Sequence, residues 1–293
     1  MPDIVVVGDL IDDIVVVPNE RPRADTDTLS SIRHVGGGSA ANTAAWIGHL
    51  GAQVRFVGMV GERDVARHES ELRAHGVTTA LQAHPSLPTG SIVLLIDGER
   101  RSMFTERGAN VALDCDAVEL GGASALHVTG YSLFGALDAG ASFERLIARA
   151  VGVGVPVSIT PGSAGFISDF GAERFRAVID GATVLFPNLA EGQMLTGLDD
   201  PIEVATALSA LAPVVALTLG SAGVLVSTDS AAPQLVAAVP STTRDPTGAG
   251  DAFAAGFLVE WTSSGHVLAA AEAGARAAAS AIGVIGGRPA LGA

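Results

Sequence analysis

The sequence Thr243-Arg-Asp-Pro-Thr-Gly-Ala-Gly250-Asp251-Ala-Phe-Ala-Ala-Gly256 joins a glycine-rich turn directly to an apolar helix. Gly248 and Gly250 permit a tight turn, and the first N–H groups of the following helix have no intrahelical partner. These groups and the positive end of the helix dipole favour an anion such as a phosphate oxygen. Asp251 in the first turn can accept a proton from a substrate hydroxyl. Read alone, the stretch is equally a glycine turn whose acidic residue is favoured by the dipole.

The basic residues of the 293-residue chain are 17 arginines, and lysine is absent. A P-loop, a protein kinase and a Schiff-base enzyme each need a lysine amine, so the sequence excludes these mechanisms. Any phosphoryl transfer must therefore rely on arginine, metal and backbone N–H groups. This makes the Gly248–Asp251 turn the best candidate phosphate site in the chain.

The net charge of −14 argues against nucleic acid and anionic membranes as partners, because both need a cationic face. Cys115 is the single cysteine and cannot form an intrachain disulfide. No run of about 18 strongly apolar residues predicts a membrane span, and the N-terminal apolar run has the length of a strand. We therefore expect a cytoplasmic protein with no membrane partner.

Strand and helix patterns alternate from about residue 125 onward, which predicts a mostly parallel sheet covered by helices. Upstream, two β-rich segments, about residues 14–34 and 89–107, are expected to meet as a small separate sheet. The second segment is predicted to form a hairpin around Asp97-Gly98. Such a sheet would form a lid over the carboxyl ends of the main strands, where open α/β sheets bind ligands. No linker or repeat interrupts the pattern, so we expect one domain spanning residues 1–293.

A second glycine motif, Gly36-Gly-Gly38-Ser-Ala-Ala-Asn42-Thr-Ala44, lies far upstream of the first. Its glycines let a ligand approach the backbone, and the Asn42 amide offers both a donor and an acceptor. The alternative is a glycine loop with Asn42 capping a helix. The segment Gly58-Met-Val-Gly61-Glu-Arg-Asp64 follows this motif and adds two further glycines to it.

In order and spacing these motifs resemble the ribokinase-like, or pfkB, family of carbohydrate kinases. The resemblance covers nearly the whole chain and implies a three-layer α/β/α fold with a mostly parallel central sheet and a small β-sheet lid. It implies phosphorylation of a primary hydroxyl by MgATP, with Asp251 as catalytic base. The anion hole would be formed by Gly248, Ala249 and Gly250.

Further positions are carried over from the family motifs one at a time. The sugar would contact Asp13, Gly37, Gly38 and Asn42, and Asp12 lies next to Asp13, so a slip of one residue stays open. ATP would lie against Asn188, Thr218, Gly220 and Gly223. Glu191 of Asn188-Leu-Ala-Glu191 would hold Mg²⁺ through water, although Asn-x-x-Glu alone predicts a helix cap. Asp245 and Thr247 match positions that hold a monovalent cation such as K⁺ in some members. Arg107 ends the lid and would reach substrate or phosphate, or else be exposed.

The family includes kinases for ribose, fructose, 2-keto-3-deoxygluconate, phosphorylated hexoses and nucleosides. Ser39 replaces the lysine of ribokinases, which argues against strict ribokinase identity. Asp9, Asp12 and Asp13 would repel a phosphorylated sugar unless Arg33, Arg101 or Arg107 compensated, which favours a neutral sugar. A nucleoside would need an apolar slot, for which the candidates are Phe104 and Phe134.

Two other function classes remain open from the residues: a catalytically silent sugar- or nucleotide-binding protein of the same fold, and a nicotinamide dehydrogenase. The second lacks the expected strand–glycine–helix fingerprint. The resemblance also implies a homodimer, since paired lids often form the subunit contact in this family and a small sheet is marginal when unsupported. A monomer whose lid only covers the site is the alternative.

Overall fold

The structure, a computed structural model, describes residues 3–97, 100–228 and 232–291. The strands of its large sheet are β1 (Asp3–Val7), β4 (Gln53–Val57), β6 (Thr78–Thr79), β10 (Ala123–Thr129), β11 (Val157–Thr160), β12 (Val184–Leu185), β13 (Val214–Thr218), β14 (Val224–Thr228) and β15 (Gln234–Val236). Within the described ranges these nine strands have the order β15-β14-β13-β12-β11-β10-β1-β4-β6. The strands from β13 to β6 pair in parallel, and β14 and β15 are antiparallel. The expected mostly parallel sheet is confirmed.

Both faces of this sheet are buried. In β1, Ile4 and Val6 join one apolar cluster, whereas Val5 and Val7 join the other. An uninterrupted apolar run is what a parallel strand covered on both sides requires. The chain therefore folds in three layers, with the sheet between two sets of helices.

The helices divide between the two clusters. One face is covered by α1 (Ser39–His49), α2 (Val65–Ala74), α9 (Ala249–Ser264) and α10 (Val267–Ala281). The other is covered by α4 (Ala141–Gly152), α5 (Ala164–Phe170), α6 (Ala172–Val178), α7 (Leu189–Thr196) and α8 (Pro201–Leu208). A short helix, α3 (Gly130–Leu133), follows β10. Within the described ranges, no helix combines the length and apolar character needed to cross a membrane.

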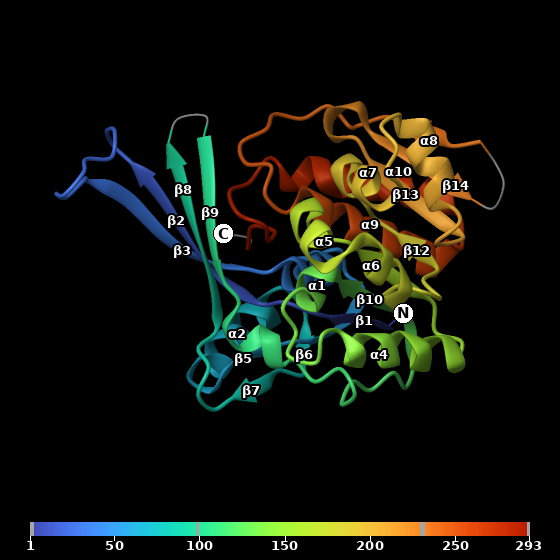
Figure 1. Cartoon of the computed structure of the whole chain (residues 1–293), viewed down its shortest axis with the longest axis horizontal. Coiled ribbons are helices and arrows are strands. Elements are labelled where there is room, and N and C mark those ends of the chain that lie inside the picture. The colour runs from blue at the N-terminus through green and yellow to red at the C-terminus, as the bar shows by residue number, and fades with distance from the viewer. Residues whose placement is uncertain (1–2, 98–99, 229–231, 292–293) are drawn as a thin grey trace.

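A separate sheet is made by β2 (Ile11–Pro18), β3 (Ser30–Gly37), β8 (Gly90–Asp97) and β9 (Arg100–Glu106), in the order β3-β2-β8-β9. We call this sheet the lid, and Figure 1 shows it projecting away from the helix-covered body. It confirms the expected small sheet and the antiparallel β8–β9 hairpin, although Gly98 of the predicted turn lies outside the described residues. The first two strands are joined to the hairpin by a parallel pairing of β2 with β8.

Candidate active site

The Asp251 carboxylate is held by two side chains from the first turn of α1. Ser39 Oγ donates a hydrogen bond to Oδ1 at 2.6 Å, and Asn42 Nδ2 donates to Oδ2 at 3.1 Å. The pKa of Asp251 is raised to about 7: burial is the largest cause, the hydrogen bonds from Ser39 and Asn42 lower it, and the charges of Asp9 and Asp13 raise it. A carboxylate with a pKa near neutrality suits a general base at physiological pH. The two glycine motifs, more than 200 residues apart in the sequence, meet at this carboxylate.

Asp9, which directly follows β1 and Gly8, holds α1 in this position. Its Oδ2 accepts a hydrogen bond from Ser39 N at 2.8 Å, and its Oδ1 accepts one from Ala40 N at 3.2 Å. Thr129 Oγ1, at the end of β10, donates to Oδ1 at 2.8 Å. A carboxylate at the positive end of a helix is stabilised by the unpaired N–H groups there. Asp9 thus acts as the N-cap that α1 lacks in its own sequence.

The turn before α9 combines a constrained glycine with an open one. Gly248 has φ of 76°, and a Cβ there would lie 2.5 Å from Gly287 Cα. A Cβ on Gly250 would meet no atom within 4 Å. Gly248 is therefore required by the fold, whereas the space beside Gly250 is free for a ligand. The α9 amides of this turn lie where helical N–H groups have no intrahelical acceptor.

The lid strand β2 separates the two neighbouring carboxylates. Asp12 receives two hydrogen bonds from Arg67 of α2, at 2.8 and 2.7 Å. Asp13 points to the opposite face, since side chains alternate along a strand, and a Cβ on Gly37 would lie 2.2 Å from its Oδ2. Burial raises the pKa of Asp13 to about 6. Asp13 thus lies near Asp9 and Asp245, whose charges also raise its pKa, and Asp12 is paired with α2 on the other side.

Asn42 leaves one polar atom without a partner. Its side chain is buried at 5% exposure, and no hydrogen bond reaches Oδ1 from the described residues. Buried polar atoms are normally satisfied, so this oxygen is an unpaired and fully enclosed acceptor on the residue that binds Asp251. Gly38, beside it, has φ of 93° and would clash with the Asp9 backbone if it carried a side chain.

Asn188 and Glu191 form a capping box at the start of α7. Asn188 Oδ1 accepts from Glu191 N at 2.9 Å, and the Glu191 carboxylate accepts from Asn188 N at 3.0 Å and from Nδ2 at 2.7 Å. Glu191 is 3% exposed, and burial raises its pKa to about 7, with a further increase from the charge of Asp251. The pair therefore serves as a helix cap.

Across the described part of the chain, no three His, Cys, Asp or Glu side chains converge as a metal cage. Glu191 and Asn188 are a carboxylate and an amide, which are ligand types compatible with Mg²⁺.

The positions expected to contact nucleotide or a monovalent cation lie near the same edge. Thr218 ends β13 and bridges to Asn188. Gly220 has free space around it, whereas a Cβ on Gly223 would lie 2.2 Å from Val236 O, so Gly223 is required by strand packing. The remaining pair lies in the turn before α9: Asp245 Oδ1 accepts from Thr247 N at 3.0 Å and from Thr247 Oγ1 at 2.7 Å.

Three expectations about lid and aromatic side chains need correction or refinement. Arg107 is half-buried, not exposed: its Nη1 donates to Tyr131 O, and its guanidinium lies 4.8 Å from the centre of the Phe166 ring. Phe104 lies on the lid face opposite to Asp13, judged by the strand register. Phe134 is 4% exposed and packs in an aromatic cluster with Phe166, Phe170 and Phe175. Neither phenylalanine is therefore placed to line a slot beside Asp13.

Sequence reasoning missed the contacts of three residues at this site. Ser39 was noted only as a departure from lysine and Asp9 only as a charge, although Asp9 follows a buried strand, where α/β sheets place ligand-binding residues. Arg288, near the C-terminus, donates to Gly37 O at 3.1 Å. No motif surrounds Arg288, so nothing in the sequence pointed to it.

Comparison with known proteins agrees with this geometry. The chain is 29% identical to ribokinase of Bacillus subtilis, over 99% of this chain and 97% of the relative. It is 28% identical to an ATP-dependent ribose-1-phosphate kinase of Halopiger xanaduensis, over 89% and 85% of the two chains. The crystal structure of adenosine kinase from Sinorhizobium meliloti superposes with a TM-score of 0.88 at 25% identity, covering 98% of this chain and 96% of that one. The pattern of the pfkB family carbohydrate kinases matches residues 1–291, and the chain belongs to this family of sugar kinases.

Proposed function

We propose that the protein transfers the γ-phosphoryl group of ATP to a primary hydroxyl of a small neutral sugar or sugar acid that is ribose-, fructose- or ketodeoxygluconate-like. The observation that carries this proposal is the Asp251 carboxylate, held by Ser39 and Asn42 at the N-terminus of α9 with its pKa raised to about 7. One carboxylate thus lies beside both the hydroxyl-binding groups of α1 and the anion-binding turn of α9.

In the proposed reaction Asp251 accepts the proton of the acceptor hydroxyl as that oxygen attacks the γ-phosphorus, and the bond from the γ-phosphorus to the β,γ-bridging oxygen breaks, so that ADP leaves. The amides at the start of α9 stabilise the charge that develops on the phosphate oxygens. Asp13 and the side-chain amide of Asn42 hold other hydroxyls of the acceptor. Mg²⁺, when bound with ATP, neutralises phosphate charge, and Glu191 and Asn188 would hold it through water.

The charges around Asp251 favour a neutral acceptor. Asp9 and Asp13 both raise its pKa, so they would also oppose a phosphate on the substrate. Arg107 is bonded to the Tyr131 backbone and packs on Phe166. Arg33 pairs with Val15 and so shares the lid face of Asp13, where it is exposed and one residue pair further out. Ribose 1-phosphate, named for the Halopiger xanaduensis relative, is the phosphorylated acceptor that tests this preference.

A nucleoside acceptor is the second candidate, and one observation favours it. The lid face that carries Asp13 also carries Val15, Leu94 and Met103, which are neighbours by strand register. An apolar surface beside the hydroxyl site suits a planar base. The adenosine kinase of Sinorhizobium meliloti, similar over nearly its whole length, is consistent with this alternative.

The test is ADP release by the purified protein with D-ribose, D-fructose, 2-keto-3-deoxygluconate, ribose 1-phosphate and adenosine as acceptors. We expect Mg²⁺-dependent turnover that is fastest with a neutral acceptor. Binding of ATP without turnover on any acceptor would instead support the silent binding protein, and binding of NAD(H) in a thermal-shift screen would support a dehydrogenase.

We also propose a homodimer formed through the lid. Ile32 and Phe104 share the face opposite to Asp13, and they are 58% and 62% exposed. Apolar side chains on a projecting sheet favour association, which would also cover the edges of the sheet.

A further inference from the structure

The segment after α10 connects the turn before α9 with helix α1. Gly286 N donates to Asp245 Oδ2 at 3.0 Å, and Trp46 Nε1 donates to Gly287 O at 2.9 Å. Gly287 also packs so closely on Gly248 and on Asn42 that a Cβ at Gly287 would lie 2.3 Å from Asn42 Nδ2. These contacts join the turn before α9 to the helix that carries Asn42. We call residues 286–288 the C-terminal strap.

Arg288 extends the strap to the base of the lid. Its Nη2 donates to Gly37 O at 3.1 Å, and its Nη1 donates to Glu71 Oε2 at 3.3 Å. β3 is an edge strand of the lid, so Arg288 provides a donor beside an edge that has no neighbouring strand. The arginine side chain is only 9% exposed, and its Nε has no hydrogen-bond partner among the described residues. A buried cation with an unsatisfied donor is a poor source of stability, which suggests another role.

The backbone at Gly36 and Gly37 lies between two charged groups. A Cβ on Gly36 would lie 2.2 Å from Arg288 Nη1, and a Cβ on Gly37 would lie 2.2 Å from Asp13 Oδ2. Because successive residues of a strand point to opposite faces, the guanidinium and the carboxylate lie on opposite sides of the same backbone. Both glycines are thus explained by close approach of these side chains, in addition to any contact with a ligand.

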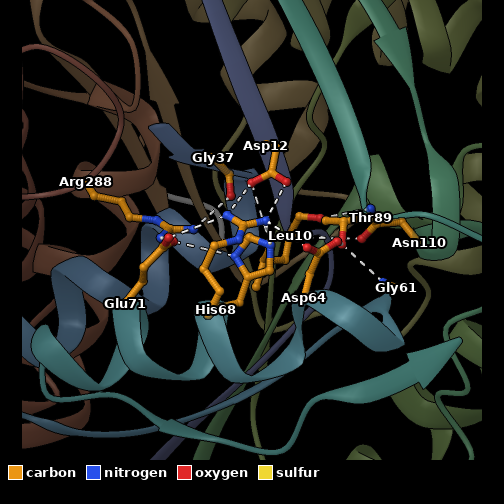
Figure 2. A network of polar contacts seen from close by, with 11 residues as sticks. Leu10, Asp12, Gly37, Gly61, Asp64, His68, Glu71, Thr89, Asn110 and Arg288 are labelled. Carbon is orange, nitrogen blue, oxygen red and sulfur yellow. Dashed lines mark hydrogen bonds and ion pairs between the residues drawn. The ribbon is translucent and has the colours of Figure 1, made fainter. Parts of the chain in front are cut away.

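Figure 2 shows that Arg288 belongs to a larger network at the base of the lid. Glu71, its partner on α2, lies 3.6 Å from His68 Nδ1, and Asp12 lies 3.6 Å from His68 Nε2. Asp64 accepts a hydrogen bond from Thr89, just before β8, at 2.5 Å. Helix α2 thus anchors β2, its N-cap residue Asp64 anchors the segment just before β8, and Arg288 connects α2 to β3.

We propose that Arg288 is a positioning residue for the acceptor site: it fixes the Gly36–Gly37 backbone from behind and thereby orients Asp13 toward the acceptor. This inference rests on the proposed kinase function. The C-terminal strap would thus fix the position of Gly36 and Gly37 relative to Asn42 and Asp251. The ATP side of the site, beyond Asn188 and Thr218, has no recorded hydrogen bond or ion pair with Arg288 among the described residues.

The charge of Arg288 affects the pKa of Asp13, so its loss should change the pH dependence of acceptor binding, which a purely structural role would not do. Burial raises the pKa of Asp13, the positive charge of Arg288 lowers it, and the charges of Asp9, Asp12 and Asp245 raise it. Loss of the cation therefore leaves Asp13 protonated at higher pH. The acid limb of kcat/KM for the acceptor should then move to higher pH, because only the carboxylate accepts hydrogen bonds with both oxygens.

The experiment compares wild type with Arg288→Gln and Arg288→Lys, using the panel acceptor with the highest kcat/KM. We expect Arg288→Gln to raise the acceptor KM roughly tenfold, which is the effect of losing about 1.4 kcal/mol of binding. The KM for ATP should change less than twofold, and the acid limb should move to higher pH. Arg288→Lys keeps the charge without the two-pronged geometry, so it should restore the acid limb but only part of the acceptor KM. Equal changes in both KM values, or an unshifted acid limb, would overturn the proposal.

Two further variants keep the test decisive. Arg276→Gln removes one positive charge from an exposed position on α10 and should change neither KM. If Arg288→Gln does not fold, Glu71→Gln removes the partner of Arg288 from a more exposed position and should raise the acceptor KM in the same direction. An unchanged acceptor KM in Glu71→Gln would then refute the idea. Failure of the kinase proposal itself would appear separately, as a wild-type protein with no turnover.

Discussion

Replacement of Ser39 by alanine should change the pH at which the enzyme works more than its maximal rate. Ser39 Oγ donates to Asp251 Oδ1 at 2.6 Å, the shorter of the two side-chain bonds recorded for this carboxylate. A hydrogen bond to a charged group contributes about 1.5–3 kcal/mol, and one pKa unit corresponds to about 1.4 kcal/mol. Loss of the bond destabilises the ionised form, so the pKa of Asp251 should rise by roughly one to two units from its value of about 7.

The assay is the initial rate of ADP release between pH 5.5 and 9.5 at saturating ATP and acceptor. Since the base must be ionised, wild-type kcat should fall as the pH drops below about 7. In Ser39→Ala the fall should begin roughly one to two pH units higher, and most of the rate should return at the alkaline end. Ser209→Ala, which removes a hydroxyl bonded to Ala205 O within a helical turn, is the matched control and should leave the profile unchanged. A Ser39→Ala rate that is reduced by the same factor at every pH would refute the reasoning.

Three further predictions follow from the same geometry. Asp251→Asn should abolish turnover but retain ATP binding by calorimetry. It should also raise Tm at pH 8, because an acid whose folded pKa is raised to about 7 destabilises the fold when it is ionised. This gain in Tm should shrink as the pH falls toward 4. Gly248→Ala should lower Tm, with a cost on the order of 1–3 kcal/mol from its φ of 76°. Gly250→Ala should keep Tm and lose activity with ATP. Equal losses of Tm in the two variants would contradict the assignment of Gly248 to the fold and of Gly250 to ligand binding. Phe104→Ser, at an exposed lid position, should convert a dimer to a monomer in light scattering, and an unchanged mass would remove the lid interface.

Local patterns were enough to predict much of the fold. The glycine turn before α9, the apolar runs of β1 and β10 and the amphipathic pattern of α4 each depend on neighbouring residues. The two-residue strands β6 and β12 carry too few residues to show a period, so pairing with longer neighbours defines them. The parallel pairing of β2 with β8 joins segments about 70 residues apart and has no local signature.

The site could be predicted only where the family motifs extend. Asp13 could not be separated from Asp12 by sequence, because their difference lies in the alternation of β2 and in the partner Arg67 on another helix. The Asn188–Glu191 pair was ambiguous for a similar reason, since a capping box and an outer metal partner use the same two residue types. Arg288 depends on a contact between the C-terminus and residue 37, which no spacing rule encodes.

The acidic side chains around Asp251 determine the electrostatics of the candidate site. Asp13, Glu191 and Asp251 all have raised pKa values, of about 6, 7 and 7, with burial as the largest cause for each. When the pKa of an acid is higher in the folded than in the unfolded state, the folded protein loses stability as the pH rises from the unfolded to the folded pKa. Ionisation of these three acids at neutral pH therefore lowers the free energy of unfolding. Arg288 behind Asp13 and the helix N-terminus beside Asp251 supply positive potential at the two ends of this cluster. In the proposed reaction one end receives the acceptor and the other the phosphate, so the arrangement that opposes ionisation of these acids also favours a ligand with hydroxyls on one side and anionic oxygens on the other.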